Sequence, residues 1–172
     1  MPPFDLRLAL ASDVGAMHEF LMEHGTNEWN YLPADGVAAE FRDIADGRAF
    51  AVLAEHDQLL MGFAIVYPNM IRFPDFTSPA LPASSVGYIA EVVVHKNYAG
   101  KGVGAALLAE VKVVLLRLGM TEVNIDCHEE NKASRGMMRK AGFEELALFP
   151  DHDRRTTGTR NTWVGRLVLS KS

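Results

Sequence analysis

The hydrophobic and polar positions along this chain follow two periods, and together these periods predict a mixed α/β fold. Short runs rich in β-branched and aromatic residues, bounded by turn-forming residues, predict strands. The predicted strands cover residues 4–10, 49–55, 59–67, 86–94, 122–127, 143–149 and 162–169. Elsewhere apolar residues recur every three or four positions, as on one face of a helix. The predicted helices cover residues 13–23, 36–45, 103–118 and 132–141.

The order of these elements predicts how the strands pair. The tight turn at His56-Asp57 joins two strands into a hairpin, which makes them antiparallel neighbours. The strand at 86–94, the helix after it and the strand at 122–127 form a crossover, which makes a parallel pair. Residues 68–85 contain four prolines and predict a long irregular loop of the kind that is often functional. No linker divides the chain, so we expect a single domain over residues 1–172.

Composition narrows the classes of protein that fit. The 172 residues are 48% hydrophobic, which is ample for one packed core. The formal net charge is −5 and no basic patch is visible, so we expect no nucleic-acid partner. The stretch at 103–118 is interrupted by Glu110, Lys112 and Arg117, which argues against a membrane span. One cysteine, Cys127, and no signal peptide make the cytoplasm the expected location.

Three glycines, Gly100, Gly102 and Gly104, lie between a strand end and a helix start. Glycine allows positive φ angles and a close backbone approach, so successive amides can turn toward one anion at the positive end of a helix. Such a segment can bind a pyrophosphate, although a flexible loop that caps a helix would have the same composition. It is not a Walker loop, because Lys101 is followed by glycine and valine.

The residues around these glycines resemble a known family. The run from Glu91 to Leu108 is similar to the signature region of the GNAT N-acetyltransferases, whose core is Q/R-x-x-G-x-G/A. A second stretch, from Asn131 to the pair Gly142-Phe143, resembles the family's second signature. The resemblance covers residues 86–143. It implies a mixed, mostly antiparallel sheet with one central parallel strand pair, flanked by helices.

The resemblance also implies acetyl-CoA as the cosubstrate. The family's pyrophosphate loop falls on Gly100, Lys101, Gly102, Val103, Gly104 and Ala105. The backbone of Val92, Val93 and Val94 would contact the pantetheine arm and the thioester, and Asn131 would bond to the CoA arm. This sequence has Ala99 where the family has glutamine or arginine, so the backbone amides must carry most of the phosphate binding.

Acetyl transfer to an amine needs a base that removes the ammonium proton and groups that hold the developing oxyanion. Two carboxylates have family precedent by position, Glu91 and Asp126, and Glu91 is favoured because it interrupts an apolar strand. The tyrosine that commonly protonates the departing thiolate is replaced by Met138. Substitute donors are Cys127, His128, Tyr98 or water.

On the acceptor side, the loop before the second helix contains Glu28, Trp29 and Tyr31. These side chains can receive a cationic amine by charge and stacking, or they can anchor the loop to the body of the domain. We therefore expect an N-acetyltransferase that transfers acetyl directly to a primary amine of a small molecule or peptide. The alternative is an acyl-CoA-binding sensor or interaction module with impaired catalysis. No metal is expected, and a homodimer is expected from resemblance alone.

Overall fold

The computed structural model describes residues 2–70 and 81–170, which form one seven-stranded sheet in the order β1-β2-β3-β4-β5-β7-β6. Its strands are β1 (Asp5–Leu8), β2 (Phe50–His56), β3 (Leu59–Tyr67), β4 (Val86–Val94), β5 (Glu122–His128), β6 (Glu144–Pro150) and β7 (Asn161–Val168). Only β4 and β5 are parallel, and every other neighbouring pair is antiparallel. The predicted fold class is therefore confirmed, including the central parallel pair.

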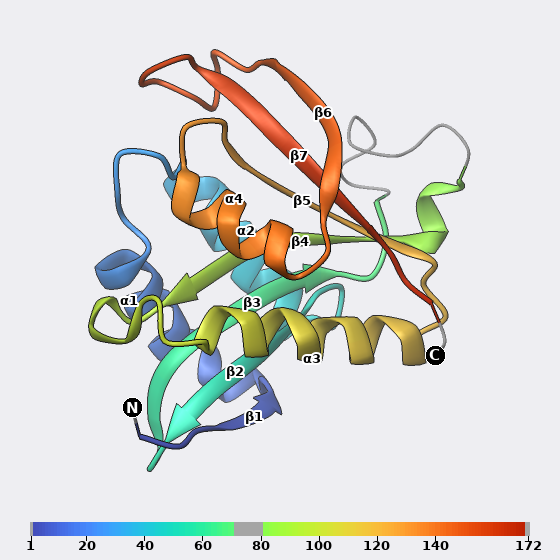
Figure 1. The fold of residues 1–172 in the computed structure, drawn as a ribbon. Coiled ribbons are helices and arrows are strands. Elements are labelled where there is room, and N and C mark those ends of the chain that lie inside the picture. Colours follow the sequence, from blue (N-terminus) through green and yellow to red (C-terminus); the bar gives the residue numbers. More distant parts are fainter. Residues whose placement is uncertain (1, 71–80, 171–172) are drawn as a thin grey trace.

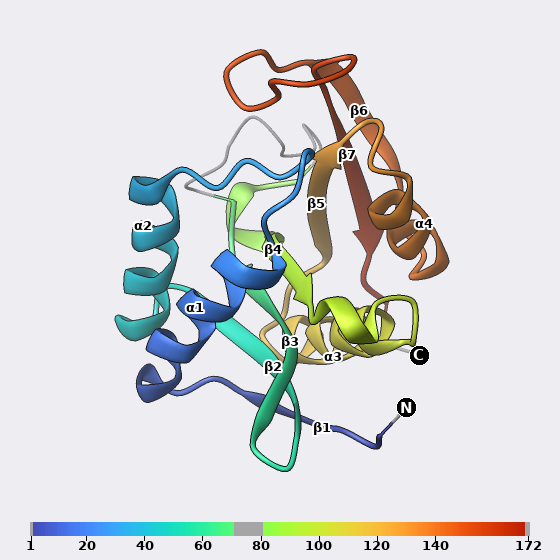
Figure 2. The same ribbon diagram turned by 90° about the vertical axis from the view of Figure 1, so that its left-hand side faces the viewer.

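Helices cover both faces of the sheet (Figure 1). The helices α1 (Val14–His24) and α2 (Ala34–Ala45) lie on one face, and α3 (Val103–Arg117) and α4 (Lys132–Lys140) lie on the other. The side view in Figure 2 shows the sheet between these two layers. Each layer encloses its own apolar cluster: Phe20, Phe41 and Phe63 belong to the first, and Leu107, Leu115 and Trp163 to the second.

The predicted elements agree with the observed ones to within two residues at each end, and two local details differ from a simple pattern. The second helix begins at Ala34 rather than Gly36, because Pro33 precedes it in an extended conformation. Asp13 does not cap α1 with its side chain. Its carboxylate instead accepts from the Arg7 guanidinium at 2.8 Å and from the Leu10 amide at 2.7 Å. Of the predicted loop at 68–85, residues 71–80 lie outside the described part of the chain.

A β-bulge in the middle of β4 decides which way Glu91 points. Glu91 pairs with Ile65 on β3, but Ile89 pairs with Val66, so Ala90 is the extra residue. An extra residue reverses the alternation of side chains between the two faces of a strand. Ile89 packs in the cluster under α3, whereas Ile65, opposite Glu91, packs in the cluster under α1 and α2. The bulge therefore turns Glu91 toward the face that α1 and α2 cover.

The same strand also separates from its parallel neighbour. The pairing of β4 with β5 ends at Ile89 opposite Ile125, although β4 continues to Val94 and β5 to His128. Beyond that point β4 pairs with β3, and β5 pairs with β7. The two strands thus open a gap in the middle of the sheet.

None of the helices in the described ranges is both long and apolar enough to cross a membrane.

The packing of α3 on the sheet predicts which substitutions unfold the protein. Leu107→Ala removes a side chain that is 0% exposed in the cluster under α3, and we expect a loss of about 2–5 kcal/mol in the free energy of unfolding. Val113→Ala on the same helix removes a side chain that is 39% exposed, and its effect should stay within about 0.5 kcal/mol. Urea denaturation of both variants measures the difference, and equal losses would contradict this packing.

Candidate active site

The glycine segment forms a backbone turn that opens directly onto the first turn of α3. Gly100 has φ +73° and Gly102, at the N-cap of α3, has φ +91°, which is the left-handed region that favours glycine. A Cβ added at either position would meet nothing within 4 Å, so the space above this backbone is open. At Gly104 a Cβ would overlap Met137 Sδ, so the third glycine allows α3 and α4 to approach each other.

This turn has the properties of an anion site. The first bond within α3 runs from the Ala106 amide to the Gly102 carbonyl at 3.0 Å. The amides of residues 103–105 precede it and so have no carbonyl acceptor in their own helix. They lie at the positive end of a fifteen-residue helix, which favours a phosphate. The Val103 side chain is buried in the core, so this residue can contact an anion only through its backbone.

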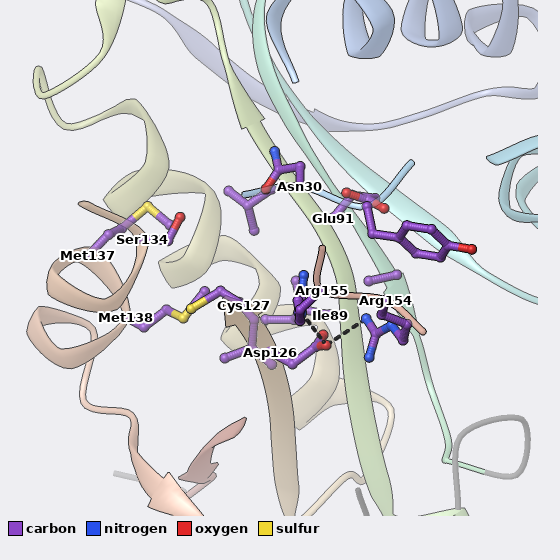
Figure 3. A pocket seen from close by; sticks show the side chains of 14 residues that line it. Asn30, Ile89, Glu91, Asp126, Cys127, Ser134, Met137, Met138, Arg154 and Arg155 are labelled. Carbon is purple, nitrogen blue, oxygen red and sulfur yellow. Dashed lines mark hydrogen bonds and ion pairs between the residues drawn. The ribbon is translucent and has the colours of Figure 1, made fainter. Parts of the chain in front are cut away.

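A pocket lies in the gap between β4 and β5 (Figure 3). It encloses about 560 Å³, part of which is open to solvent. Residues of both strands, of α4 and of two loops line it: Asn30, Tyr31, Ile89, Ala90, Glu91, Val92, Ile125, Asp126, Cys127, Ser134, Met137, Met138, Arg154 and Arg155. The predicted bases Glu91 and Asp126 are therefore brought together in one cavity.

The pocket connects the two faces of the sheet. Cys127 and Met138 belong to the apolar cluster under α3, and Val92 packs against it. Glu91 points to the other face because of the bulge, and Asp126 alternates with Ile125 and so points there too. Figure 3 shows Glu91 across the pocket from the methionines of α4. One side is thus apolar and faces α3 and α4, and the other side is charged and faces α1 and α2.

The Glu91 carboxyl is half-buried and has acidic neighbours. Burial raises its pKa well above the usual range, and the nearby charges of Glu40 and Asp126 raise it further, against a smaller opposite effect of Arg154. A carboxylate with a raised pKa is a stronger base, which suits it to proton abstraction.

Asp126 is in a different electrostatic situation. Its carboxylate accepts from Tyr88 Oη at 2.5 Å, from Arg154 at 2.7 Å and from Arg155 at 3.1 Å. Two of these bonds appear as dashed lines in Figure 3. Arg155 is buried and also donates to Thr162 Oγ1 at 2.9 Å. Charged and hydroxyl donors thus occupy both oxygens of Asp126, so its carboxylate is part of this network.

Most of the groups predicted to replace the missing tyrosine as proton donor make other interactions in the structure. Burial raises the pKa of the Cys127 thiol to about 12, so the thiol is a weak acid. The Glu130 amide donates to His128 Nδ1 at 3.0 Å, so Nε2 carries the proton and donates to the Thr157 carbonyl at 2.7 Å. Tyr98 packs against the His95 ring and is not among the residues that line the pocket. Met138 is buried in the pocket wall.

The predicted acceptor-binding residues separate into two groups. Tyr31 lines the pocket, with 44% of its surface exposed, and so does its neighbour Asn30. Trp29 packs against the His128 ring at 4.8 Å between centroids, and the Glu28 carbonyl accepts from Thr157 Oγ1 at 3.0 Å. Glu28 and Trp29 therefore hold the loop at residues 25–33 against the far end of β5.

Asn131 caps α4, since its side-chain oxygen accepts from the Ser134 amide at 3.2 Å. Lys101 is exposed, and its Nζ lies 5.9 Å from the centroid of the Tyr98 ring. Over the described part of the chain, no group of three or more histidine, cysteine, aspartate or glutamate side chains is placed to hold a metal ion.

Sequence analysis missed four residues of the site. Arg154 and Arg155 come from the polar loop after β6, and Asn30 precedes Tyr31 in the loop before α2; nothing local in the sequence connects them with β4. Glu40 carried a local signal, because it lies at a position of the apolar stripe of α2.

Comparisons with known proteins agree with this geometry. The sequence profile of the Acetyltransferase (GNAT) family matches residues 16–143. No protein of curated function matches the sequence at a significant level. Because 516 chains of solved structures match, the fold by itself does not identify an acceptor.

Three solved structures illustrate the likeness. A GNAT-family protein from Desulfovibrio desulfuricans aligns with a TM-score of 0.74 and 19% identity, over 98% of this chain and 100% of that one. The Salmonella typhimurium protein yncA was solved with its cofactor acetyl-CoA. It aligns with a TM-score of 0.75 and 19% identity, over 99% of this chain and 96% of that one. The ribosomal-protein-S18-alanine N-acetyltransferase from Escherichia coli aligns with a TM-score of 0.74 and 15% identity, over 99% of this chain and 96% of that one. The family profile spans most of the chain, so the chain belongs to the GNAT family of acetyltransferases.

Proposed function

We propose that this protein transfers the acetyl group of acetyl-CoA directly to a primary amine, with Glu91 as the base. The observation that carries the proposal is the position of Glu91. It lies in the gap between β4 and β5, on the charged side of a pocket whose other side carries Met137, which packs on Gly104 at the start of α3. A base and an anion site on opposite faces of one gap are what a ternary complex needs.

The backbone of the glycine turn and of β4 supports the proposed binding of acetyl-CoA. The open turn at Gly100 and Gly102 and the amides of residues 103–105 would hold the pyrophosphate. The pantetheine arm would then follow the separated edge of β4 along Val92, Val93 and Val94, with Asn131 at the start of α4 beside it. Acetyl-CoA in the yncA structure, on the same fold, agrees with this choice of cosubstrate.

The chemistry requires two proton transfers. Glu91 accepts one proton from the acceptor's ammonium group, which leaves a neutral amine. The nitrogen attacks the thioester carbonyl, a C–N bond forms, and the C–S bond breaks as the thiolate leaves. The second proton of the nitrogen balances the charge of the thiolate, directly or through water, so no tyrosine at position 138 is needed. Backbone amides of the separated β4 edge would stabilise the oxyanion.

The acceptor would reach Glu91 from the face that α1 and α2 cover. Asn30 and Tyr31 are the loop residues that line this side, whereas Glu28 and Trp29 would act indirectly by fixing the loop. The alanine acceptor named for the Escherichia coli enzyme is a primary amine, which is the acceptor class that a carboxylate base suits. A cytoplasmic location and a homodimer stay predictions from the sequence.

The rival function, an acyl-CoA-binding module without catalysis, arose from Met138 alone. The Glu91 carboxyl at the gap favours an enzyme, since a module that only binds has no need of a base there. Thiol release with a panel of primary amines separates the two functions. Tight acetyl-CoA binding without amine-dependent thiol release would support the rival.

Gly102→Ala tests the anion site. The added Cβ forces a left-handed backbone on a non-glycine residue, at a cost of about 1–2 kcal/mol, and it enters the open space above the turn. We expect acetyl-CoA affinity to fall at least about tenfold by calorimetry. Gly119→Ala is the matched control, because Gly119 has φ +80° at the other end of α3. It should lose similar stability and keep full affinity; equal affinity losses in both variants would refute the site.

Glu91→Gln tests the base. The amide preserves the shape of the side chain and cannot accept the proton, so we expect kcat/KM for amine acetylation to fall about 10²–10⁴-fold with acetyl-CoA affinity unchanged. Glu145→Gln changes an exposed strand carboxylate on β6 and should leave both quantities as they are. Wild-type turnover in the Glu91 variant would overturn the assignment of the base.

Asp126→Asn separates a structural carboxylate from a catalytic one. The substitution removes the charge that Arg154 and Arg155 share, and Arg155 is buried. Breaking such a pair costs about 3–5 kcal/mol, so we expect a lower free energy of unfolding together with lower activity. Denaturation and kinetics measured side by side decide the matter. If activity falls while the free energy of unfolding is unchanged, Asp126 acts as a base instead.

A further inference from the structure

We propose that Arg155 is a positioning residue for the amine acceptor, because its buried guanidinium fixes the loop at residues 25–33 beside the pocket. Asn30 and Tyr31 of that loop line the pocket. The inference rests on the proposed function, since these two residues would meet the proposed amine. Arg155 belongs to the connection between β6 and β7 at residues 151–160, which lies beyond the residues that resemble the family signatures.

The loop at residues 25–33 lies between α1 and α2 and has no helix or strand of its own. The Asn27 side chain accepts from the amides of Trp29 and Asn30 at 2.8 and 2.9 Å. The Asn30 side chain donates to the Gly25 carbonyl at 2.6 Å. These bonds set the shape of the turn but do not attach it to the sheet. Side chains that are to hold a ligand in such a loop need support from other elements of the fold.

The connection between β6 and β7 gives the loop this support, just before the two residues that line the pocket. Thr157 Oγ1 donates to the Glu28 carbonyl at 3.0 Å, and Arg155 Nη1 donates to the Trp29 carbonyl at 3.4 Å. The Trp29 ring packs on the His128 ring, and His128 Nε2 bonds to the Thr157 carbonyl at 2.7 Å. One segment thus holds two consecutive carbonyls of the loop, although 129 and 126 positions of sequence separate the partners.

Arg155 is itself fixed by two strands of the sheet. Its side chain is only 5% exposed. Its Nε donates to Thr162 Oγ1 on β7 at 2.9 Å, and its Nη2 donates to Asp126 Oδ2 on β5 at 3.1 Å. Thr162 Oγ1 donates in turn to Asp151 Oδ2 at 2.6 Å. The rigid fork of donors in one guanidinium therefore joins β5, β7 and the loop.

This arrangement separates the position of the acceptor from the chemistry. Glu91 lies on β4, which is paired with β3, and the anion site lies at the glycine turn before α3. Release of the loop would move Asn30 and Tyr31 and leave those two parts in place. A loop that is fixed before the amine binds does not have to be ordered during binding, which improves affinity. A positioning role therefore predicts a higher KM for the amine with unchanged affinity for acetyl-CoA.

Two variants release the loop in different ways. Arg155→Lys keeps a positive charge beside Asp126, but one ammonium group cannot reproduce the fork that also reaches β7 and the loop. Thr157→Val nearly keeps the shape of the side chain and removes the hydroxyl that donates to Glu28. In both we expect KM to rise at least about fivefold, kcat to change less than KM, and acetyl-CoA affinity by calorimetry to stay unchanged. The amine is the best acceptor among phenethylamine, putrescine and alaninamide.

Two control variants separate positioning from stability. Thr159→Val lies in the same connection, but Thr159 Oγ1 accepts from the Asn161 amide at 3.4 Å. Arg166→Gln removes an arginine that pairs with the buried carboxyl of Glu122, at the start of β5, at 3.6 Å. We expect Arg166→Gln to unfold at a lower urea concentration with an unchanged KM for the amine. Thr159→Val should leave both quantities as they are.

A second readout follows the loop directly and needs no acceptor. Hydrogen exchange of the whole protein, measured by mass spectrometry on peptides that cover residues 25–33, reports how readily this loop opens. We expect exchange there to be at least about tenfold faster in Arg155→Lys and Thr157→Val than in the wild type, with peptides of β2 and β3 unchanged. In both control variants the loop should exchange as in the wild type.

The outcomes separate this inference from the proposed function. If exchange at residues 25–33 is unchanged in both Arg155→Lys and Thr157→Val, these contacts do not hold the loop and the inference is refuted. If exchange becomes faster but KM for the amine stays the same, the loop does not position the acceptor, and the inference is refuted as well. If both readouts behave as expected but Glu91→Gln keeps wild-type turnover, Arg155 has the proposed role and the assignment of the base fails.

Discussion

The site depends on one irregularity in the sheet, the extra residue at Ala90 in β4. A strand with strict alternation would direct Glu91 to the same face as Ile89, into the apolar cluster under α3. The bulge reverses the alternation and turns the carboxyl group toward α2 instead. At the same point the pairing of β4 with β5 ends, which opens the gap that forms the pocket. A bulge next to a functional site is a common device for re-aiming a side chain.

Two chemically different faces meet in that gap. The face under α3 supplies a turn of glycines, free helix amides and sulfur-containing side chains, which suit a phosphate and an apolar arm. The opposite face supplies carboxylates and arginines in a partly buried network. Under the proposed function, the thioester and the amine would meet where β4 and β5 part.

The charges of the network are arranged so that its two acids behave differently. Asp126 accepts hydrogen bonds from the Tyr88 hydroxyl and from two arginines, so both of its oxygens already have partners. Glu91 has another carboxyl group as its neighbour and is removed from water, which favours its protonated form. Two carboxylates that line the same pocket thus have different surroundings, which agrees with the preference for Glu91 over Asp126 that the sequence gives.

The sequence by itself determined the elements, the fold class and the glycine turn, because each depends on local patterns: period two in strands, period three to four in helices, and positive φ at Gly100 and Gly102. It also singled out Glu91, which lines the pocket. Only the tertiary structure decided the direction in which Glu91 points, the ion pairs of Asp126 with Arg154 and Arg155, and the packing of Trp29 on His128. These contacts join residues that are far apart in the chain. The protonation of a side chain depends on the groups that the fold brings next to it, and the residue type alone does not fix it.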